Sequence, residues 1–261
     1  YGVALNERMF SRYYLITRTL TVAIRTELKS DDNVKGLSKI NLDNFQVVSC
    51  PNLSSLKGML FGRFKLESIL YDHINNVDFL IIRLPSLIGI LSIEIARKMN
   101  KPFLIELVGC PWDAFWNHSW KGKLVAPFMW HATKKAVKNA PYVLYVTNKF
   151  LQRRYPCTGI TIGCSNVALP TLYESVLDAR LHKIKQITKH KPIVLGTTAV
   201  VDVRYKGQEY VIQAIAELNR QGYNFEYHLA GGGDNSFLKF VAERNGVLDK
   251  VKFLGPIPHE K

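Results

Sequence analysis

Residues 194–218 read VLGTTAVVDVRYKGQEYVIQAIAEL and decide the fold of the second half of the chain. An apolar, β-rich run that ends in glycine is followed by a basic loop, by Gly207 and by apolar residues at helical spacing. The segments FEYHLAGGG at 225–233 and KVKFLGPI at 250–257, with a helical pattern over 235–245 between them, continue the alternation. Strands that alternate with helices in this way predict a parallel sheet in an α/β domain.

The first half of the chain shows the same alternation. A polar, helical stretch at 171–190 separates the two halves. We therefore predict two αβα domains, over 1–170 and 191–261, joined by a linker helix over 171–190. The first is expected to have a fully buried strand at 78–83, a loop at 109–113, further strands at 20–25, 45–49, 103–108 and 142–147, and helices at 56–75, 87–99 and 125–139.

Charge is distributed unevenly along the 261 residues, whose formal net charge is +14. Residues 1–170 hold 22 Lys and Arg against 11 Asp and Glu, a balance of +11, which favours an anionic partner such as a membrane surface or a phosphorylated ligand. A nucleic-acid binder is not expected, because the basic residues are dispersed and no reading motif is present. Four cysteines without a CxxC pair, no signal peptide and no apolar run of about 18 residues predict a cytoplasmic protein.

The loop that opens the helix after residue 207 is the first candidate site. A helix N-terminus offers free N–H groups and the positive end of a dipole, Lys206 and Arg204 add cations, and Gly207 allows close approach of the backbone. An anion site and a solvated basic turn are about equally well supported by the residues alone.

Glycines mark the two following loops at the carboxyl ends of predicted strands. Gly231, Gly232 and Gly233 could form a nest of N–H groups beside a ligand, or a simple turn capped by the next residues. They do not match GxGxxG, so a dinucleotide fingerprint is absent. Gly255 and Pro256 could hold a flat base against a stiff backbone edge, and a plain loop explains them equally well.

Aromatic and polar residues gather in the segment 108–123, which follows a predicted buried strand. Aromatic rings stack on the C–H faces of sugars while polar groups bind the hydroxyls, so this composition favours a sugar site over an amphipathic cap. The candidates are Gly109, Trp112, Asp113, Asn117 and His118.

Taken together, VLGTTAVVDVRYKGQEYVIQAIAEL, FEYHLAGGG and KVKFLGPI resemble the donor domain of the group 1 retaining glycosyltransferases of GT-B fold. IELVGCPWDAFWNHSWKGK and APYVLYVTNKFLQRRYP resemble the acceptor domain of such enzymes from bacterial surface-polysaccharide synthesis. The resemblance covers most of 78–261 and implies two Rossmann-like domains, the second of them incomplete. It also implies transfer of a sugar, with retention, from a nucleoside diphosphate sugar to a glycan or a lipid-linked acceptor.

The resemblance assigns roles to particular residues. Lys206 matches the lysine that neutralises the donor diphosphate, Gly196 and Gly207 frame it, and the glycines 231–233 and 255 with Pro256 surround the donor. His118 is a candidate catalytic or polar group on the acceptor side. Helix dipoles and Lys206, rather than a metal, would stabilise the leaving diphosphate, because no DxD-type motif is evident.

Two departures from the family pattern qualify this assignment. The family often carries an arginine five or six residues before the lysine, where this chain has Val201 and Val200, and Arg204 could substitute. The E-x7-E motif is expected beyond Lys261 and the N-terminal glycine-rich loop before Tyr1, so we expect a fragment and leave open whether it is active. A non-catalytic module that binds nucleotide sugars is the alternative. Docking to the inner face of the plasma membrane is a further expectation.

Overall fold

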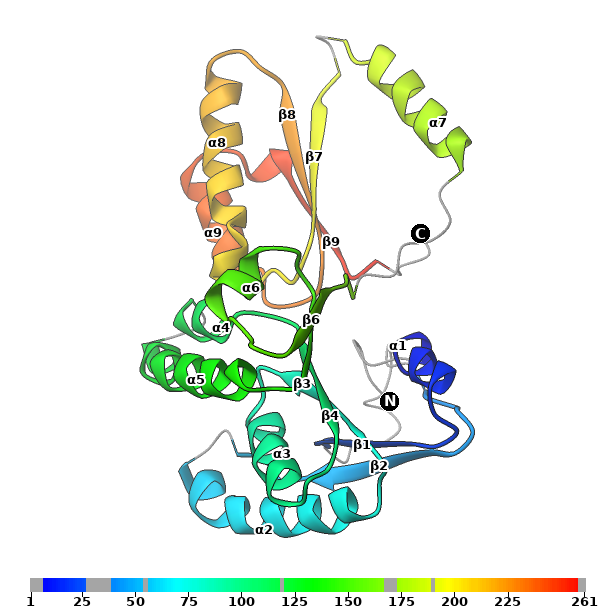
Figure 1. Ribbon diagram of the computed structural model, residues 1–261. Coiled ribbons are helices and arrows are strands. Elements are labelled where there is room, and N and C mark those ends of the chain that lie inside the picture. The colour runs from blue at the N-terminus through cyan, green and yellow to red at the C-terminus, as the bar shows by residue number, and fades with distance from the viewer. Residues whose placement is uncertain are drawn as a thin grey trace. The chain divides into compact units, whose positions relative to one another are not determined.

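The computed structural model describes residues 7–26, 39–53, 56–117, 120–166, 173–188 and 191–257. Contacts within the chain define two compact units. One comprises 1–111 with 128–166, and the other comprises 112–127 with 167–261. Each unit contains parallel β-sheet and α-helices (Figure 1).

Two parallel sheets form in the first unit, a pair of strands in the order β1-β2 and four strands in the order β3-β4-β5-β6. In the four-stranded sheet the connections between successive parallel strands include helices, as is usual for parallel pairing. The elements are α1 (Glu7–Ser11), the 3₁₀-helix η1 (Arg12–Leu15), β1 (Leu20–Arg25), β2 (Phe45–Cys50), α2 (Leu56–Asn75), β3 (Leu80–Leu84), α3 (Leu87–Lys98), β4 (Phe103–Leu107), β5 (Tyr142–Tyr145), α6 (Phe150–Arg154) and β6 (Ile160–Gly163).

Helices α2 and α3 share an apolar core. Leu66 and Leu70 of α2 pack in one cluster with Leu91 and Ile95 of α3, at helical spacing on each helix. The side chain of Ser86 caps α3 by accepting a hydrogen bond from the Gly89 N–H at 3.2 Å. The rigid layer that results carries the loops at the carboxyl ends of the strands.

The second unit contains α7 (Glu174–Lys185) and a three-stranded parallel sheet in the order β7-β8-β9. Helices α8 and α9 pack on one face of this sheet (Figure 1). Their buried residues join Tyr227 and Leu229 of β8 in a single core. The elements are β7 (Ile193–Thr198), the 3₁₀-helix η3 (Arg204–Lys206), α8 (Gln208–Arg220), β8 (Phe225–Ala230), α9 (Ser236–Arg244), the 3₁₀-helix η4 (Leu248–Lys250) and β9 (Val251–Gly255).

Most predicted elements lie within a few residues of the observed ones, with three differences. Strand β3 is not fully buried, because one face carries Arg83 and the preceding Phe79 is 43% exposed. The segment 109–113 is not wholly a loop, since helix α4 (Pro111–Trp116) begins within it. Helix α5 (Trp120–Lys138) begins five residues before the predicted start. The predicted linker at 171–190 stays a prediction.

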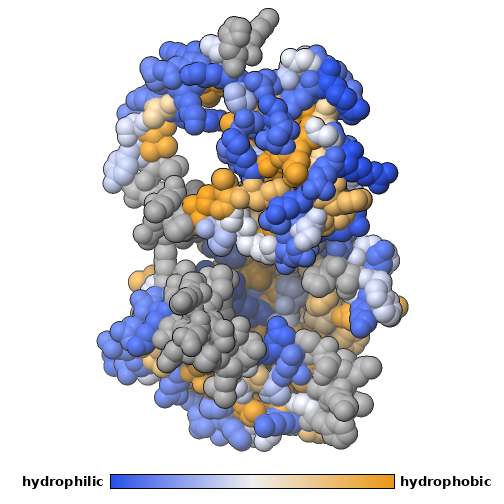
Figure 2. All heavy atoms as spheres, turned by 180° about the vertical axis from the view of Figure 1, so that it is seen from behind, coloured by the Kyte–Doolittle hydropathy of each residue, from blue (hydrophilic) through white to orange (hydrophobic). Residues whose placement is uncertain are grey.

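Large hydrophobic side chains reach the surface in both units (Figure 2). In the second unit they include Leu177 and Leu181 of α7 and Val194 of β7. Within the described ranges, no helix is both long enough and apolar enough to cross a bilayer.

Candidate functional site

The loop after β7 is joined to the glycine turn after β8 by backbone hydrogen bonds. The N–H of Ala199 donates to the carbonyl of Ala230 at 3.0 Å, and the N–H of Val201 donates to the carbonyl of Gly232 at 3.0 Å. These two bonds extend the sheet beyond its last paired residues. They fix the loop directly beside the turn.

Gly231 lies where no other residue fits. A Cβ at this position would be 1.8 Å from the carbonyl oxygen of Ala199, far inside contact distance. Its N–H donates to the carbonyl of Gly255 at 2.9 Å, which ties the turn to the end of β9. Gly233 has a φ of +114°, and a Cβ there would meet the carboxylate carbon of Asp202 at 2.8 Å. Gly231 is therefore required by the close packing of the strand ends, and Gly233 by its backbone conformation and by Asp202.

An uncharged hollow of about 390 Å³ opens at these three strand ends. Its lining contains five of the nine predicted donor residues, and none of the described residues that line it carries a charge. The lining residues are Val201, Leu229, Gly231, Gly232, Gly233, Asn235, Phe253, Gly255 and Pro256. Open α/β sheets bind ligands at this edge, so the hollow has the place and the backbone character of a ligand site.

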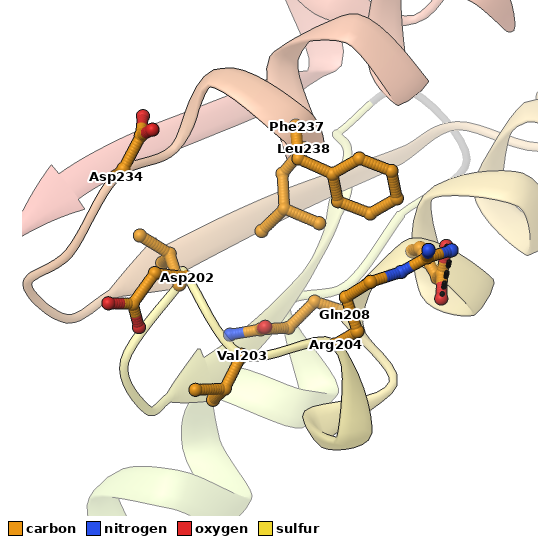
Figure 3. Close-up of a pocket in the computed structure, with 9 residues that line it drawn as sticks. Asp202, Val203, Arg204, Gln208, Asp234, Phe237 and Leu238 are labelled. Carbon is orange, nitrogen blue, oxygen red and sulfur yellow. Dashed lines mark hydrogen bonds and ion pairs between the residues drawn. The ribbon is translucent and has the colours of Figure 1, made fainter. Parts of the chain in front are cut away.

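A second hollow of about 280 Å³ lies beside the start of α8, and charged side chains form part of its lining (Figure 3). Asp202 and Asp234 lie on one side of it in the view, and Arg204 lies on the other. The remaining lining residues are Val201, Val203, Gln208, Glu209, Phe237 and Leu238. Three carboxylates and one guanidinium give this hollow a formal charge of −2, which disfavours an anion.

Arg204 is already engaged within its own unit. Its Nη2 donates to Glu209 Oε2 at 3.0 Å, and its guanidinium lies 4.5 Å from the centre of the Phe237 ring. Glu209, whose side chain is only 11% exposed, therefore offsets the charge that Arg204 would bring to a phosphate. Hydrogen bonds from the Ser236 side chain and backbone N–H also lower the pKa of Asp234, which keeps that carboxylate charged.

Lys206, by contrast, has no ion-pair partner among the residues that the structure describes. It ends η3, and its Nζ lies 5.3 Å from the centre of the Tyr205 ring. Gly207 follows in the left-handed conformation, with φ +74°, and turns the chain into α8. Gly196 lies inside β7, paired with His228. None of these three predicted residues lines either hollow.

The two valines that replace the family arginine are in different environments. Val201 is 5% exposed, belongs to the core and contributes to both hollows. Val200 is 46% exposed, and its carbonyl accepts a hydrogen bond from Gln208 Nε2 at 3.2 Å. Sequence reasoning did not select Asp202, Gln208 and Asn235. The polar start of α8 and the acidic residue two positions before η3 were the available signals.

On the predicted acceptor side, α4 arranges the aromatic residues. Trp112 and Trp116 stack with ring centres 5.0 Å apart and planes at 12°, as the spacing of one helical turn allows. Asn117 Nδ2 donates to the carbonyl of Asp113 at 2.9 Å at the end of this helix. No atom of the described residues beyond its chain neighbours would lie within 4 Å of a Cβ on Gly109. His118, the predicted catalytic residue, lies outside the described residues.

Comparison with known proteins places this geometry in a family. Residues 179–261 match the model of the glycosyl transferases group 1. The whole chain is 32% identical over 259 residues to Protein CapJ of Staphylococcus aureus, covering 98% of this chain and 63% of CapJ.

This chain is similar to the group 1 glycosyl transferases.

Solved structures agree with this assignment at the level of the fold. Sucrose-phosphate synthase from Thermosynechococcus elongatus matches with a TM-score of 0.52 at 18% identity, over 84% of this chain and 57% of that chain. A glycosyltransferase from Rickettsia africae matches with a TM-score of 0.51 at 14% identity, over 95% of this chain and 63% of that chain. The predicted Rossmann-like α/β architecture of GT-B type is confirmed. The chain described here spans less than two thirds of the length of each of these relatives.

Proposed function

We propose that this chain supplies the donor-binding part of a glycosyltransferase. The enzyme transfers a sugar from a nucleoside diphosphate sugar to a glycan or a lipid-linked acceptor. The observation that carries the proposal is the hollow lined by Gly231–Gly233, Gly255 and Pro256, which lies at the carboxyl ends of β7, β8 and β9 inside the segment that matches the family. An uncharged wall of backbone suits a nucleoside and its diphosphate, which approach N–H groups closely.

The diphosphate needs positive charge as its bond to the sugar breaks. Helix α8 has 13 residues, so its N-terminus supplies the positive end of a helix dipole, and Lys206 precedes it by two residues. We infer that Lys206 turns toward the diphosphate when the donor binds, since no ion pair among the described residues holds it elsewhere. Stabilisation of the leaving group in this way requires no metal. Retention at the anomeric carbon is part of the proposal and follows the family resemblance.

Incubation with a panel of nucleotide sugars and a glycan acceptor, followed by mass spectrometry, tests the proposal. We expect release of a nucleoside diphosphate with one donor, unchanged by EDTA. Binding without release or transfer supports the alternative, a non-catalytic module that binds nucleotide sugars. If the chain neither binds a nucleotide sugar nor turns it over, both the proposed transferase and the alternative binding module are contradicted.

Removing one carboxylate from the hollow beside α8 is expected to tighten nucleoside diphosphate binding. Glu209→Gln keeps the shape of the side chain but frees Arg204 from its 3.0 Å ion pair and lowers the local negative charge. We expect an affinity gain of roughly threefold to tenfold, about 1 kcal/mol, by calorimetry. Glu217→Gln, which breaks an exposed ion pair with Arg220 on the same helix, is the matched control. Equal affinities in wild type and Glu209→Gln would show that Arg204 does not contribute to the donor site.

We also propose that α5 docks on an anionic membrane surface. Trp120, Leu124 and Phe128 recur every four residues on one face of the helix and are 70%, 72% and 59% exposed. Lys121 and Lys134 lie over the rings of Trp120 and Trp130 at 5.7 and 4.8 Å. Exposed aromatic and apolar groups flanked by lysines suit the headgroup region of a bilayer, where each lysine contributes about 1 kcal/mol.

Liposome flotation tests this docking. We expect the chain to float with vesicles that contain anionic lipid, less strongly as salt rises. The double variant Lys121→Glu/Lys123→Glu should lose most of this binding, by roughly 2 kcal/mol or more. Lys183→Glu/Lys185→Glu makes the same charge change on the exposed helix α7 and serves as the control. Equal losses in the two variants would show that the net charge of the chain, and not the surface of α5, causes the binding. The absence of flotation at low salt would refute docking.

A further inference from the structure

A buried carboxylate in the first unit is in contact with three donor side chains. Glu106 of β4 is 5% exposed and pairs in register with Arg83 of β3. Arg12 of η1 donates through Nη2 to both carboxylate oxygens at 3.1 Å, and the Tyr13 hydroxyl donates to Oε2 at 3.0 Å. Arg83 Nε lies 3.3 Å from the same oxygen. Residues 94 positions apart in the chain are thus joined at one point of the sheet.

The charges in this cluster do not balance. Two guanidinium groups face one carboxylate, which leaves a formal excess of +1. The Nε–H of Arg12 is buried and lacks a hydrogen-bond partner among the described residues, whereas Arg83 Nε has Glu106 Oε2 as its ion-pair partner. The two side chains are nevertheless 36% and 33% exposed, so part of each arginine side chain is accessible to solvent although its Nε is buried. Buried donors without partners are rare and indicate a ligand, an ion or a functional constraint.

A purely structural role explains part of this arrangement, because Arg12 and Tyr13 fasten η1 to the sheet. Fastening requires only one guanidinium for one carboxylate, however, and Arg83 brings a second guanidinium to Glu106, with Met9 Sδ as its other contact at 3.3 Å. The cluster also lies near the carboxyl ends of β3 and β4, three residues before Gly109. Ligands of open α/β sheets bind at this edge. Its place and its surplus charge therefore point to an anion.

We propose that Arg12, Arg83 and Tyr13 form a binding site for a phosphate group of the acceptor. This inference rests on the proposed function, since it assigns the acceptor of that reaction to the phosphorylated sugars. Arginine forks match the geometry of phosphate oxygens and bind them through paired, charge-assisted hydrogen bonds. Glu106 holds both guanidinium groups in place while the site is empty, and the phosphate neutralises the surplus charge.

Calorimetric titration of the whole chain with glucose 1-phosphate and with glucose tests the site. We expect saturable binding of the phosphate ester only. Arg12→Gln and Arg83→Gln should each weaken it roughly tenfold or more. Glu106→Gln should tighten it, because the competing negative charge is gone. Arg63→Gln breaks an exposed ion pair with Glu67 and should change nothing. If the cluster is purely structural, Glu106→Gln should lower the stability of the fold and should not raise the phosphate affinity.

Two further readouts keep the result unambiguous. If an arginine variant unfolds at the assay temperature, Tyr13→Phe replaces it, and an unchanged affinity in this variant and in Glu106→Gln overturns the proposal. Loss of phosphate binding in Lys206→Ala with full binding in Arg83→Gln also overturns it, because the phosphate then occupies the donor site. Unchanged nucleoside diphosphate affinity in the arginine variants is expected, and failure of all nucleoside diphosphates to bind counts against the proposed function alone.

The phosphate can belong to a soluble sugar or to a lipid carrier, and the titration separates these sources. Dodecyl phosphate in detergent micelles is compared with glucose 1-phosphate. Tighter, Arg83-dependent binding of the lipid phosphate assigns the group to a lipid carrier. Equal or weaker binding assigns it to a soluble sugar phosphate.

Discussion

Replacement of Gly231 by alanine is expected to disrupt the packed strand ends that line the donor hollow. The new Cβ would lie 1.8 Å from the carbonyl oxygen of Ala199, and this oxygen belongs to the backbone, which cannot rotate aside as a side chain can. The Ala199 N–H is bonded to Ala230, so moving the loop also breaks the contact between β7 and β8. We expect a loss of about 3 kcal/mol or more in the free energy of unfolding of this unit, together with loss of nucleotide binding.

The neighbouring glycine provides the matched control. In the described part of the chain nothing lies within 4 Å of a Cβ built on Gly232, so Gly232→Ala should leave the midpoint of chemical unfolding nearly unchanged. Denaturant unfolding followed by circular dichroism compares the two variants with the wild type. Equal midpoints for Gly231→Ala and the wild type would show that the strand ends are not packed as described.

The strands and helices of this chain were largely predictable from local pattern. Strand β8 and helix α8 have strong apolar periodicity, and Gly207 and Gly231 mark the ends of elements. The local sequence of each segment is therefore enough to predict its secondary structure. Strand β6 was missed because it has only four residues, all of them exposed, and carries no core signal. Helix α4 was missed because Pro111 looks like a loop residue, although proline is favoured in the first turn of a helix.

The candidate site was predictable in its backbone and not in its side-chain pairs. The glycines that line the hollow follow strands, and the carboxyl ends of parallel strands meet at one edge, so topology alone brings them together. The engagement of Arg204 by Glu209 depends on side-chain direction across a 3₁₀ turn, which sequence spacing does not specify. The bond between Arg12 and Glu106 depends on tertiary packing of residues 94 positions apart.

Lys206 is the second residue whose replacement should have a large effect. It stands at the end of η3, two residues before the first residue of α8, and has no ion-pair partner in the described part of the chain. Arg204 is neutralised by Glu209, so Lys206 is the cation beside this helix N-terminus that remains available for a diphosphate. Hydrogen bonds to a charged group contribute about 1.5–3 kcal/mol, and Lys206→Ala should weaken nucleoside diphosphate binding by roughly that amount.

Calorimetric titration of the whole chain with UDP, GDP, ADP, CDP and dTDP tests the central claim most directly. We predict saturable binding of at least one of them, weakened roughly tenfold to a hundredfold in Lys206→Ala. Lys250→Ala, at the opposite edge of the sheet just before β9, should bind like the wild type. If no nucleoside diphosphate binds, or if Lys206→Ala binds as tightly as the wild type, the assignment of this edge of the sheet as the donor site is wrong.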